Sequence, residues 1–481
     1  MLANRFVPTK AAFVVAILLA SAGNAVAKDL GPTPEQGNSP PPANEQLPAS
    51  NELSQPAAEP ATAPDQTAPQ AWAVHGQSTF VWQVNPAFRS PYQGPQSLNP
   101  VTNGRETFDA TLYAGVRLWQ GAEVWINPEV DQGFGLSNTL GVAGFPSGEA
   151  YKIGQRDPYL RVQRLFLRQT INLSGEVETV SPALNQLGGT QSANRVVITM
   201  GKFSAGDIFD TNQYAHDPRN DFLNWSILDM GAWDYAADAW GYTYGAAIEW
   251  YQNWWAIRAG LLDLSTYPNS TDLDPVFISQ SQFNLELEER HEVWGQPGKL
   301  KLLFYLGRAR FGTYSDAVAI AQLTGATPTV NAVAGYRSKY GTGLNLEQQI
   351  NPDLGLFARV SWAQGNVQAY DFTDINASGS IGLSLKGTRW GRSNDTVGAA
   401  VAVNSISAAA QAYFFAGGLG ILIGDGQLPK AGLEQIFETY YSLAVLEFAK
   451  VSFDYQFINN PAYNRQRGPV SVLGLRLHAE F

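Results

Sequence analysis

The residues best suited to binding chemistry lie close together, in segment 204–238. It carries carboxylates, amides, an imidazole, a guanidinium and indole rings: Asp207, Asp210, Asn212, His216, Asp217, Arg219, Asp221, Asn224, Trp225, Asp229, Trp233, Asp234 and Asp238. Paired donors and acceptors of this kind hold hydroxyl groups, and charge-assisted hydrogen bonds are the strongest of them. The competing interpretation is structural, because Asp and Asn also cap turns and tie a loop to itself.

An acidic loop that becomes buried needs cations opposite it. The candidates alternate with apolar residues in extended segments, as in "RLFLRQT", and they are Arg164, Arg168, Arg258 and Arg359, with Glu286 and Glu288 as further acceptors. For Arg164 and Arg168 the alternative is a place in the wall without contact to a solute.

The tryptophans divide into two groups by their surroundings. Trp225, Trp233 and Trp254 are candidates for stacking against a flat solute face. Trp240, Trp250 and Trp255 lie near the ends of apolar strand faces, which is typical of a belt at a membrane interface.

The elements that must position these residues are β-strands, because apolar residues recur at every second position. In "RETFDATLYAGVRLW" Leu112 and Val116 share one face, while Asp109, Thr111 and Tyr113 share the other. The same alternation predicts sixteen strands, near 74–84, 106–118, 122–131, 164–173, 195–203, 239–250, 254–262, 281–290, 299–310, 338–348, 354–364, 380–387, 396–404, 437–446, 450–457 and 470–481. Pro128 removes a ladder hydrogen bond, so the third strand should bulge or end there.

The connections between these strands alternate in length. They are tight after the second, sixth, tenth and fourteenth strands, at "WQG", "YQN", "QINPD" and "EFA", and long after every odd-numbered strand. Short turns on one rim and long loops on the other are typical of an outer-membrane barrel. The connection 174–194, about twenty residues on the short side, has no explanation in this pattern.

The polar face of each strand decides between a lipid-facing barrel and a soluble sandwich. A sandwich would expose Lys and Glu to water, whereas this face mixes Gly, Ser, Asn, Gln, Tyr, Arg and carboxylates, as a channel lumen does. About ten residues in a tilted strand cover roughly 25 Å, the height of the apolar band. The last strand, "PVSVLGLRLHAEF", alternates in the same way and ends on Phe481.

Composition excludes several function classes. With 31 basic and 42 acidic residues among 481, the net charge of -11 argues against a nucleic-acid partner. There is no Cys, and the four His stand singly, so disulfides and His/Cys metal sites are not expected, nor is a cofactor.

Two N-terminal segments stand apart from the strands. Residues 1–27 have basic residues, the apolar run "AAFVVAILLA" and a small-residue site ending at Ala27, which predict a cleaved secretory signal. Residues 28–71 are rich in Pro and Ala and predict a disordered linker, most simply a spacer, with a peptidoglycan contact as the alternative. The barrel domain is then 72–481.

Several blocks resemble the carbohydrate-selective porins of the OprB family. They include "GKFSAGDIFDTNQYAHDPRNDFLNWSILDMGAWDYAADAWGYTYG", "RAGLLDLSTYPNS", "LELEERHEVWGQPGKLKLL" and "NPAYNRQRGPVSVLGLRLHAEF", and the resemblance extends from about residue 75 to the end. It implies a sixteen-stranded antiparallel β-barrel in the outer membrane of a Gram-negative bacterium, through which monosaccharides and similar small polar solutes diffuse passively.

The resemblance also implies partners and a site. Loop 204–238 would fold into the lumen as the constriction, with the charged and aromatic residues named above around it. The barrel would contact outer-membrane lipid and, through the strand ending at Phe481, the outer-membrane assembly machinery; a homotrimer is left open.

Three alternatives remain from the sequence. One is a porin for anionic or aromatic solutes, which differs in the constriction alone. Another is a soluble secreted β protein that binds or cleaves glycans with its many carboxylates. The third is an outer-membrane hydrolase, for which no Ser and His pairing stands out.

Overall fold

The strands were located in a computed structural model, which describes residues 69–150, 154–277 and 279–481. The predicted signal, 1–27, and all but the last residues of the predicted linker lie outside these ranges. Described residues from Pro69 to Glu480 belong to one compact unit.

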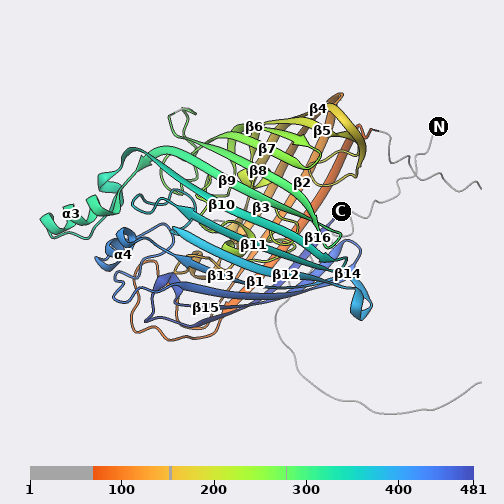
Figure 1. The fold of residues 1–481 in the computed structure, drawn as a ribbon. Coiled ribbons are helices and arrows are strands. Elements are labelled where there is room, and N and C mark those ends of the chain that lie inside the picture. Colours follow the sequence, from red (N-terminus) through yellow and green to blue (C-terminus); the bar gives the residue numbers. More distant parts are fainter. Residues whose placement is uncertain (1–68, 151–153, 278) are drawn as a thin grey trace, which may run out of the picture. The chain divides into compact units, whose positions relative to one another are not determined.

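Sixteen antiparallel strands form a closed barrel in the described residues (Figure 1). They are β1 Trp72–Asn85, β2 Asn103–Trp119, β3 Ala122–Gly133, β4 Gln155–Val180, β5 Gly189–Phe203, β6 Thr243–Gln252, β7 Trp255–Asp263, β8 Ser281–Val293, β9 Gln296–Phe311, β10 Gly335–Asn351, β11 Leu354–Ala363, β12 Ala377–Gly387, β13 Arg392–Ser405, β14 Glu434–Leu446, β15 Ala449–Asn459 and β16 Val470–Glu480. Each pairs with its sequence neighbour, and β1 closes the ring against β16 with Gln77 opposite Glu480. All sixteen predicted strands are confirmed, and the register shifts at Pro128 as expected.

The apolar face of the strands is the outer one. In β2, Leu112 and Val116 are 45% and 43% exposed, whereas Asp109, Thr111 and Tyr113 are buried inside. In β16 Leu473 points outward and Arg476 inward. A polar interior with an apolar exterior is the arrangement of a barrel that sits in lipid.

The two rims differ in their connections. The short-turn rim, at the right in Figure 1, has turns such as 120–121, 253–254, 294–295 and 352–353, and the 3₁₀ turn η4 Thr388–Trp390. The long-loop rim has loops 86–102, 134–154, 204–242, 264–280, 312–334, 364–376, 406–433 and 460–469. These loops hold η1 Leu136–Asn138, η2 Ala205–Asp207, α2 Trp225–Leu228, α3 Tyr314–Thr324, η3 Val330–Val333, α4 Ala408–Phe415 and η5 Pro461–Tyr463.

The connection that sequence reasoning left unexplained is a continuation of the strands. β4 and β5 remain paired as far as Val180 and Gly189, so the connecting segment is 181–188. For β6 the difference is opposite, because the strand begins at Thr243, later than predicted. Asp238 accepts hydrogen bonds from the backbone N–H groups of Trp240 and Tyr242, which folds the expected start of the strand into a turn.

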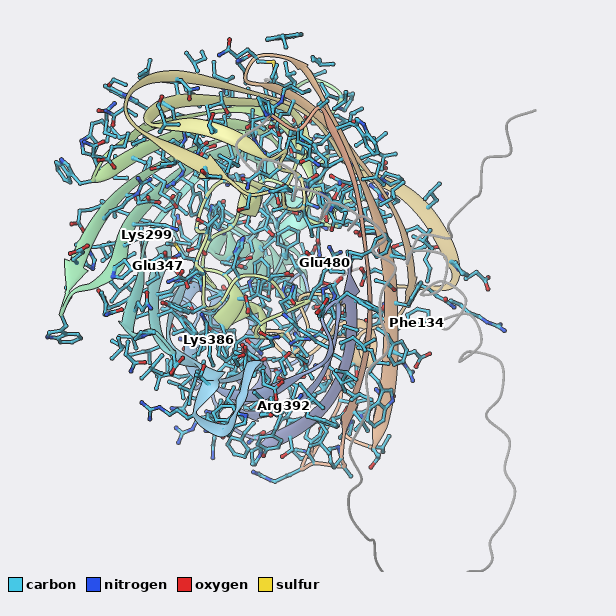
Figure 2. All side chains as sticks on the ribbon, turned by 90° about the vertical axis from the view of Figure 1, so that its right-hand side faces the viewer. Phe134, Lys299, Glu347, Lys386, Arg392 and Glu480 are labelled. Atoms are coloured by element: carbon cyan, nitrogen blue, oxygen red, sulfur yellow. The ribbon has the colours of Figure 1, made fainter. Side chains whose placement is uncertain are left out.

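The hydrophobic core lies inside the barrel, where the long loops meet. Phe145 of loop 134–154 stacks on Trp225 of loop 204–242 at 5.1 Å between ring centroids, and Phe372 of loop 364–376 meets Trp225 at 5.4 Å. Figure 2, viewed towards the short-turn rim, shows the yellow-green loop 204–242 within the ring of strands. Across the described ranges, no helix is long and apolar enough to cross a bilayer.

Candidate functional site

Carboxylates on the barrel wall hold the inward loops by their backbone. A backbone N–H that leaves water must find an acceptor, and these loops have no ladder to supply one. Glu286 accepts from the N–H of Asp210 at 2.8 Å, and Glu438 from the N–H of Leu223 at 2.6 Å. The remaining contacts of this kind join Glu347 to Gln213, Glu438 to Asn224, and Glu434 to Ala143, Gly144 and Ala462. The loops are therefore fixed against the wall.

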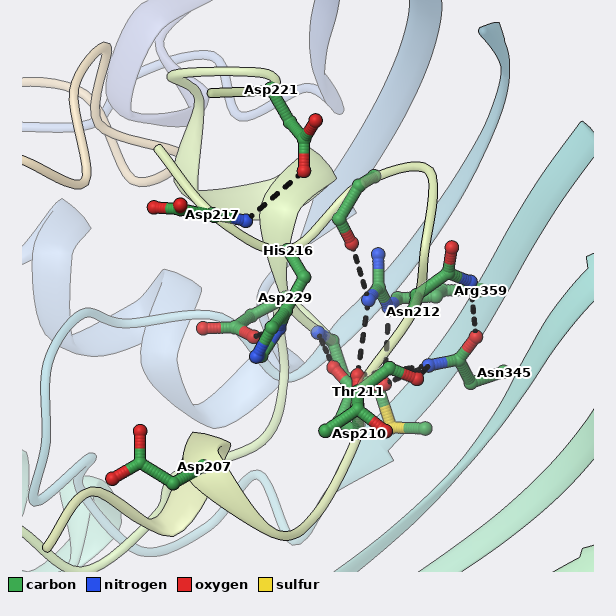
Figure 3. Close-up of polar contacts among 12 residues, drawn as sticks. Asp207, Asp210, Thr211, Asn212, His216, Asp217, Asp221, Asp229, Asn345 and Arg359 are labelled. Carbon is green, nitrogen blue, oxygen red and sulfur yellow. Dashed lines mark hydrogen bonds and ion pairs between the residues drawn. The ribbon is translucent and has the colours of Figure 1, made fainter. Parts of the chain in front are cut away.

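Asp210 is the central anchor of loop 204–242 (Figure 3). Its carboxylate accepts hydrogen bonds from Arg359 at 3.0 Å, Asn345 at 2.5 Å and the N–H of Met230 at 2.7 Å. Asn212 donates to Asn345 at 2.7 Å. Burial and saturation of these groups give Asp210, Asn212 and Arg359 a positioning role.

Four other predicted site residues also tie the loop to itself or to the wall. Asp234 pairs with buried Lys339 at 2.5 Å, and Asp238 pairs with Arg161 at 3.0 Å. Asn224 caps α2 by accepting from the N–H of Ser226 at 3.0 Å. Asp221 accepts from the N–H of Asp217 at 3.3 Å. The structural interpretation of these side chains matches their contacts.

A cavity of about 370 Å³ lies between the loops and the sector of wall formed by β1 to β4 and β16. This is near the lower end of the roughly 300–1,000 Å³ that small-molecule sites occupy. Its aromatic lining is Tyr113, Trp225, Tyr235, Trp240, Tyr242 and Phe372. Its charged and imidazole lining is Glu129, Asp131, Glu149, Asp207, Asp217, Asp229, Glu480, Arg164, Arg219, His216 and His478.

Arg164 and Asp207 form one side of this cavity. The guanidinium donates two hydrogen bonds to the carboxylate, Nε to Oδ2 at 2.7 Å and a terminal nitrogen to Oδ1 at 2.6 Å. Its centre lies 4.9 Å from the ring centroid of Tyr242. Burial alone would raise the pKa of Asp207, but the charge and hydrogen bonds of Arg164 outweigh it and lower that pKa.

Arg219 is a cation shared by several carboxylates. It lies 2.9 Å from Glu149, 3.0 Å from Glu129 and 3.4 Å from Asp109. It also donates to the hydroxyl of Tyr113 at 3.3 Å. One guanidinium among three carboxyl groups leaves this region rich in hydrogen-bond acceptors.

His216 faces Asp229 across 3.5 Å. Burial disfavours the imidazolium, but contact with Asp229 and its charge prevail, so the pKa of His216 is raised. Both residues line the cavity. The imidazole is thus held towards its charged, donor form.

The wall cluster around Arg258 lies apart from the cavity lining. Arg258 pairs with Glu286 at 2.8 Å, Glu288 at 2.8 Å and Glu249 at 3.1 Å, all buried. The expected inward orientation of Arg258 and Glu286 is correct, but Arg258 is paired with the three glutamates, and Glu286 also accepts from the backbone of Asp210. Arg258 and Glu286 therefore hold loop 204–242 in place from the barrel wall.

Two expectations for the constriction are corrected. Trp254 lies in the short turn between β6 and β7, is 62% exposed, and packs edge-on to Trp255. Arg168 donates to the backbone oxygen of Asn185 at 2.7 Å and so binds the β4–β5 connection. Neither residue is part of the cavity lining.

The expectation of an interfacial belt is wrong for Trp240. This ring lines the cavity, with the guanidinium centre of Arg161 3.3 Å from its centroid, and its Nε1 donates to the hydroxyl of Tyr159 at 2.8 Å. Trp250 is 46% exposed on the outer face, in keeping with a belt. Trp233 is buried against Tyr235 and donates to Asn284, which makes it core.

Sequence reasoning did not predict several residues that line the cavity, namely Tyr113, Glu129, Asp131, Glu149, Tyr235, Tyr242 and Phe372. Tyr113, Glu129 and Asp131 had a usable signal, since all three occupy inward positions of the second and third strands. Glu149 and Phe372 come from other loops and had none. Within the described ranges, no group of three or more His, Asp or Glu residues is placed to hold a metal ion.

Comparisons with known proteins bear on this geometry. The sequence profile described as "Carbohydrate-selective porin, OprB family" matches residues 96–481. A solved structure of Pseudomonas putida OprB, at high pH, is similar with 17% identity and a TM-score of 0.65, covering 85% of this chain and 94% of that one. That likeness shows the fold.

Two further solved structures score lower. The outer membrane channel DcaP of Acinetobacter baumannii has 10% identity and a TM-score of 0.47, with 85% of this chain and 97% of that one covered. Pseudomonas aeruginosa OccK11 has 8% identity and a TM-score of 0.42, with 87% and 98% covered. Comparison with curated proteins by sequence gave no match.

Proposed function

The chain belongs to the OprB family of carbohydrate-selective porins, and from this premise we propose that its barrel passes small neutral sugars by passive diffusion through the cavity beside loop 204–242. The family and the fold make it an outer-membrane porin, and they point to a channel rather than an enzyme. Selectivity for monosaccharides is the part we propose.

The observation that carries the proposal is the pairing of hydrogen-bonding groups with aromatic rings in one cavity. A sugar ring presents hydroxyls at its edge and weakly apolar C–H groups on its faces. Arg164, Arg219 and Glu129 supply charged donors and acceptors for the edge, while Trp240 and Tyr242 supply flat surfaces. Charge-assisted hydrogen bonds of this kind are stronger than neutral ones and fix the orientation of the solute.

The net charge of the cavity lining distinguishes neutral solutes from anionic ones. Seven carboxylate residues and two arginines line the cavity, with two histidines besides. A lumen with excess negative charge repels an anion, because the field of fixed charges is strong in a narrow, low-dielectric passage. The lining therefore favours neutral solutes over the anionic ones that the sequence left open.

Passage requires that binding be weak enough to permit release. The strongest donors and acceptors of the cavity are already paired with one another, as Arg164 is with Asp207. A sugar hydroxyl must therefore replace an existing hydrogen-bond partner, because it does not meet an unpaired charge. We accordingly assign Arg164, Asp207, His216, Arg219 and Trp225 to the solute path, with Tyr113, Trp240 and Tyr242 added.

The proposal is tested with purified protein in liposomes. Under this proposal glucose should enter faster than a disaccharide, by a margin larger than their difference in free diffusion. Protein-free liposomes set the background, and a wide general porin provides the matched comparison. Equal relative rates through this protein and through the general porin would exclude selectivity at the cavity.

A further inference from the structure

β4 and β5 extend past every neighbouring strand on the short-turn rim. β4 is last paired with β3 at Gln169, and β5 is first paired with β6 at Arg195. Between these points β4 and β5 pair with each other, from Thr170 opposite Val197 to Val180 opposite Gly189. Residues 170–194 are called the β4–β5 extension below.

The β4–β5 extension is bent. Its register shifts between Asn172 and Ser174 and again between Ser174 and Val177, so the ladder is broken by bulges, which bend a strand pair. Gly175 has a φ of 91°, a conformation that a side chain disfavours. Val177, within the bend, is 71% exposed. The bend directs the connecting segment 181–188, called the tip, back towards the barrel.

The tip is fastened at the short-turn rim by polar contacts. Arg168 donates to the backbone oxygen of Asn185 at 2.7 Å, and the N–H of Leu187 donates to Glu123 at 3.3 Å. Gly188 exchanges two hydrogen bonds with Gln70, one from its N–H at 2.9 Å and one to its oxygen at 2.9 Å.

The tip also reaches the interior. Leu187 is buried in the same apolar cluster as Tyr113, Trp125 and Phe166. Leu184 and Asn185 line the cavity together with Arg164 and Tyr113. The tip thus contributes to the cavity lining from the short-turn rim, together with Glu480 at the end of β16.

We propose that the tip is a second constriction, on the periplasmic side, and that Leu184 and Asn185 limit the size of the solute that leaves the cavity. Short turns of outer-membrane barrels face the periplasm, which gives the tip its side. Arg168 is a positioning residue, because it holds Asn185 by the backbone. The inference rests on the proposed function, since it adds an exit to the same solute path.

The first experiment shortens the tip. Val180 and Gly189 already face each other, so replacing 181–188 by Asn-Gly gives a two-residue turn that suits a hairpin. Single-channel conductance should rise roughly twofold or more, and the disaccharide rate should approach the glucose rate, because pore diameter governs both. Unchanged conductance and an unchanged rate ratio in a folded, heat-modifiable variant would overturn the inference.

The second experiment keeps the full tip and uses the absence of cysteine from the chain. In Leu184→Cys, a bulky thiol reagent added on the periplasmic side should block most of the current. Val177→Cys, exposed on the same extension, should react without changing the current. Block at neither position, with labelling confirmed by mass, would contradict the assignment.

A third comparison isolates the positioning role. Arg168→Ala should raise conductance and admit more disaccharide, whereas Arg392→Ala, an arginine at another short turn, should change neither. If wild-type protein fails to distinguish glucose from disaccharide, the proposed function fails. If it does distinguish them but no tip variant alters the ratio, the inference about the tip fails alone.

Discussion

Arg164 of β4 donates two parallel hydrogen bonds of 2.6 and 2.7 Å to the carboxylate of Asp207 in loop 204–242. This pair forms one side of the cavity. The contact joins the wall of the barrel to the loop at η2, of which Asp207 is the last residue. Ser204 donates its N–H to the same carboxylate at 2.9 Å, so Asp207 both caps the turn and meets the cation. Asp207 therefore combines a structural role with the role in solute binding that we propose for it.

Replacing Arg164 by Gln should loosen this turn. Hydrogen bonds to charged groups contribute about 1.5–3 kcal/mol, so amide exchange at Ser204 should accelerate by roughly tenfold or more. Arg389→Gln, in the exposed η4 turn, is the control. Exchange at Ser204 that stays at the wild-type rate would show that Asp207 holds the turn without its cation.

Trp240→Ala should weaken sugar binding, and Trp254→Ala should not. The two residues are matched in type, but one lines the cavity and the other is exposed in a turn. Loss of an aromatic contact of about 1 kcal/mol corresponds to a roughly fivefold weaker block of the ion current by glucose. Equal effects of the two substitutions would remove Trp240 from the solute path.

Asp374 predicts a pH dependence of loop packing. Burial raises its pKa to about 6 from 3.8, and the N–H of Ile421 and the hydroxyl of Tyr314 offset part of the increase. A raised pKa in the folded state means that its contribution to stability is complete below about pH 4 and is lost as pH rises through about 6. Above that window the contribution is constant.

Hydrogen exchange at the Ile421 amide, corrected for the intrinsic rate, measures the local opening of the loop. This opening should therefore increase between pH 4 and pH 6. Asp374→Asn keeps the shape, removes the titration and should abolish this step. Lys339 and Asp234 also act on Asp374. A step that persists in the Asn variant would assign the dependence to another group.

Asp234→Ala should detach two loops from the wall without breaking the barrel. The substitution leaves Lys339 buried without its partner and removes the acceptor for the N–H of Tyr370. Breaking a buried pair from one side costs about 3–5 kcal/mol. Loop opening by hydrogen exchange should increase and conductance should rise, while the heat-induced mobility shift of the barrel stays.

The double variant Asp234→Leu, Lys339→Met provides the control, because no orphan charge remains. It should recover much of the loop protection that the single substitution loses. Equal loss in the single and double variants would show that the lost acceptor for the N–H of Tyr370, rather than the orphan lysine, accounts for the effect.

The strands could be predicted because their signal is local. Leu112 and Val116 alternate with Asp109 and Tyr113 over a few residues, and lipid outside with water inside enforces that period along the whole barrel. The start of β6 was missed because Asp238 caps a turn at Trp240 by a contact that propensity does not show.

The site was predicted only in part, because loops meet through contacts distant in sequence. Arg164 and Asp207 were both candidates, yet so were Asp210 and Arg359, which are buried as anchors. Sequence spacing does not separate a carboxylate facing the cavity from one that holds backbone N–H groups. Glu149 enters the site because it reaches Arg219, seventy residues later.

The central claim is that the acidic, aromatic-lined cavity accepts a neutral sugar and rejects an anion of the same size. Planar-bilayer recordings with glucose and with gluconate, each titrated at constant ionic strength, test it most directly. We expect a saturable block of the ion current by glucose and little or none by gluconate. Stronger block by gluconate, or no block by either, would contradict the claim.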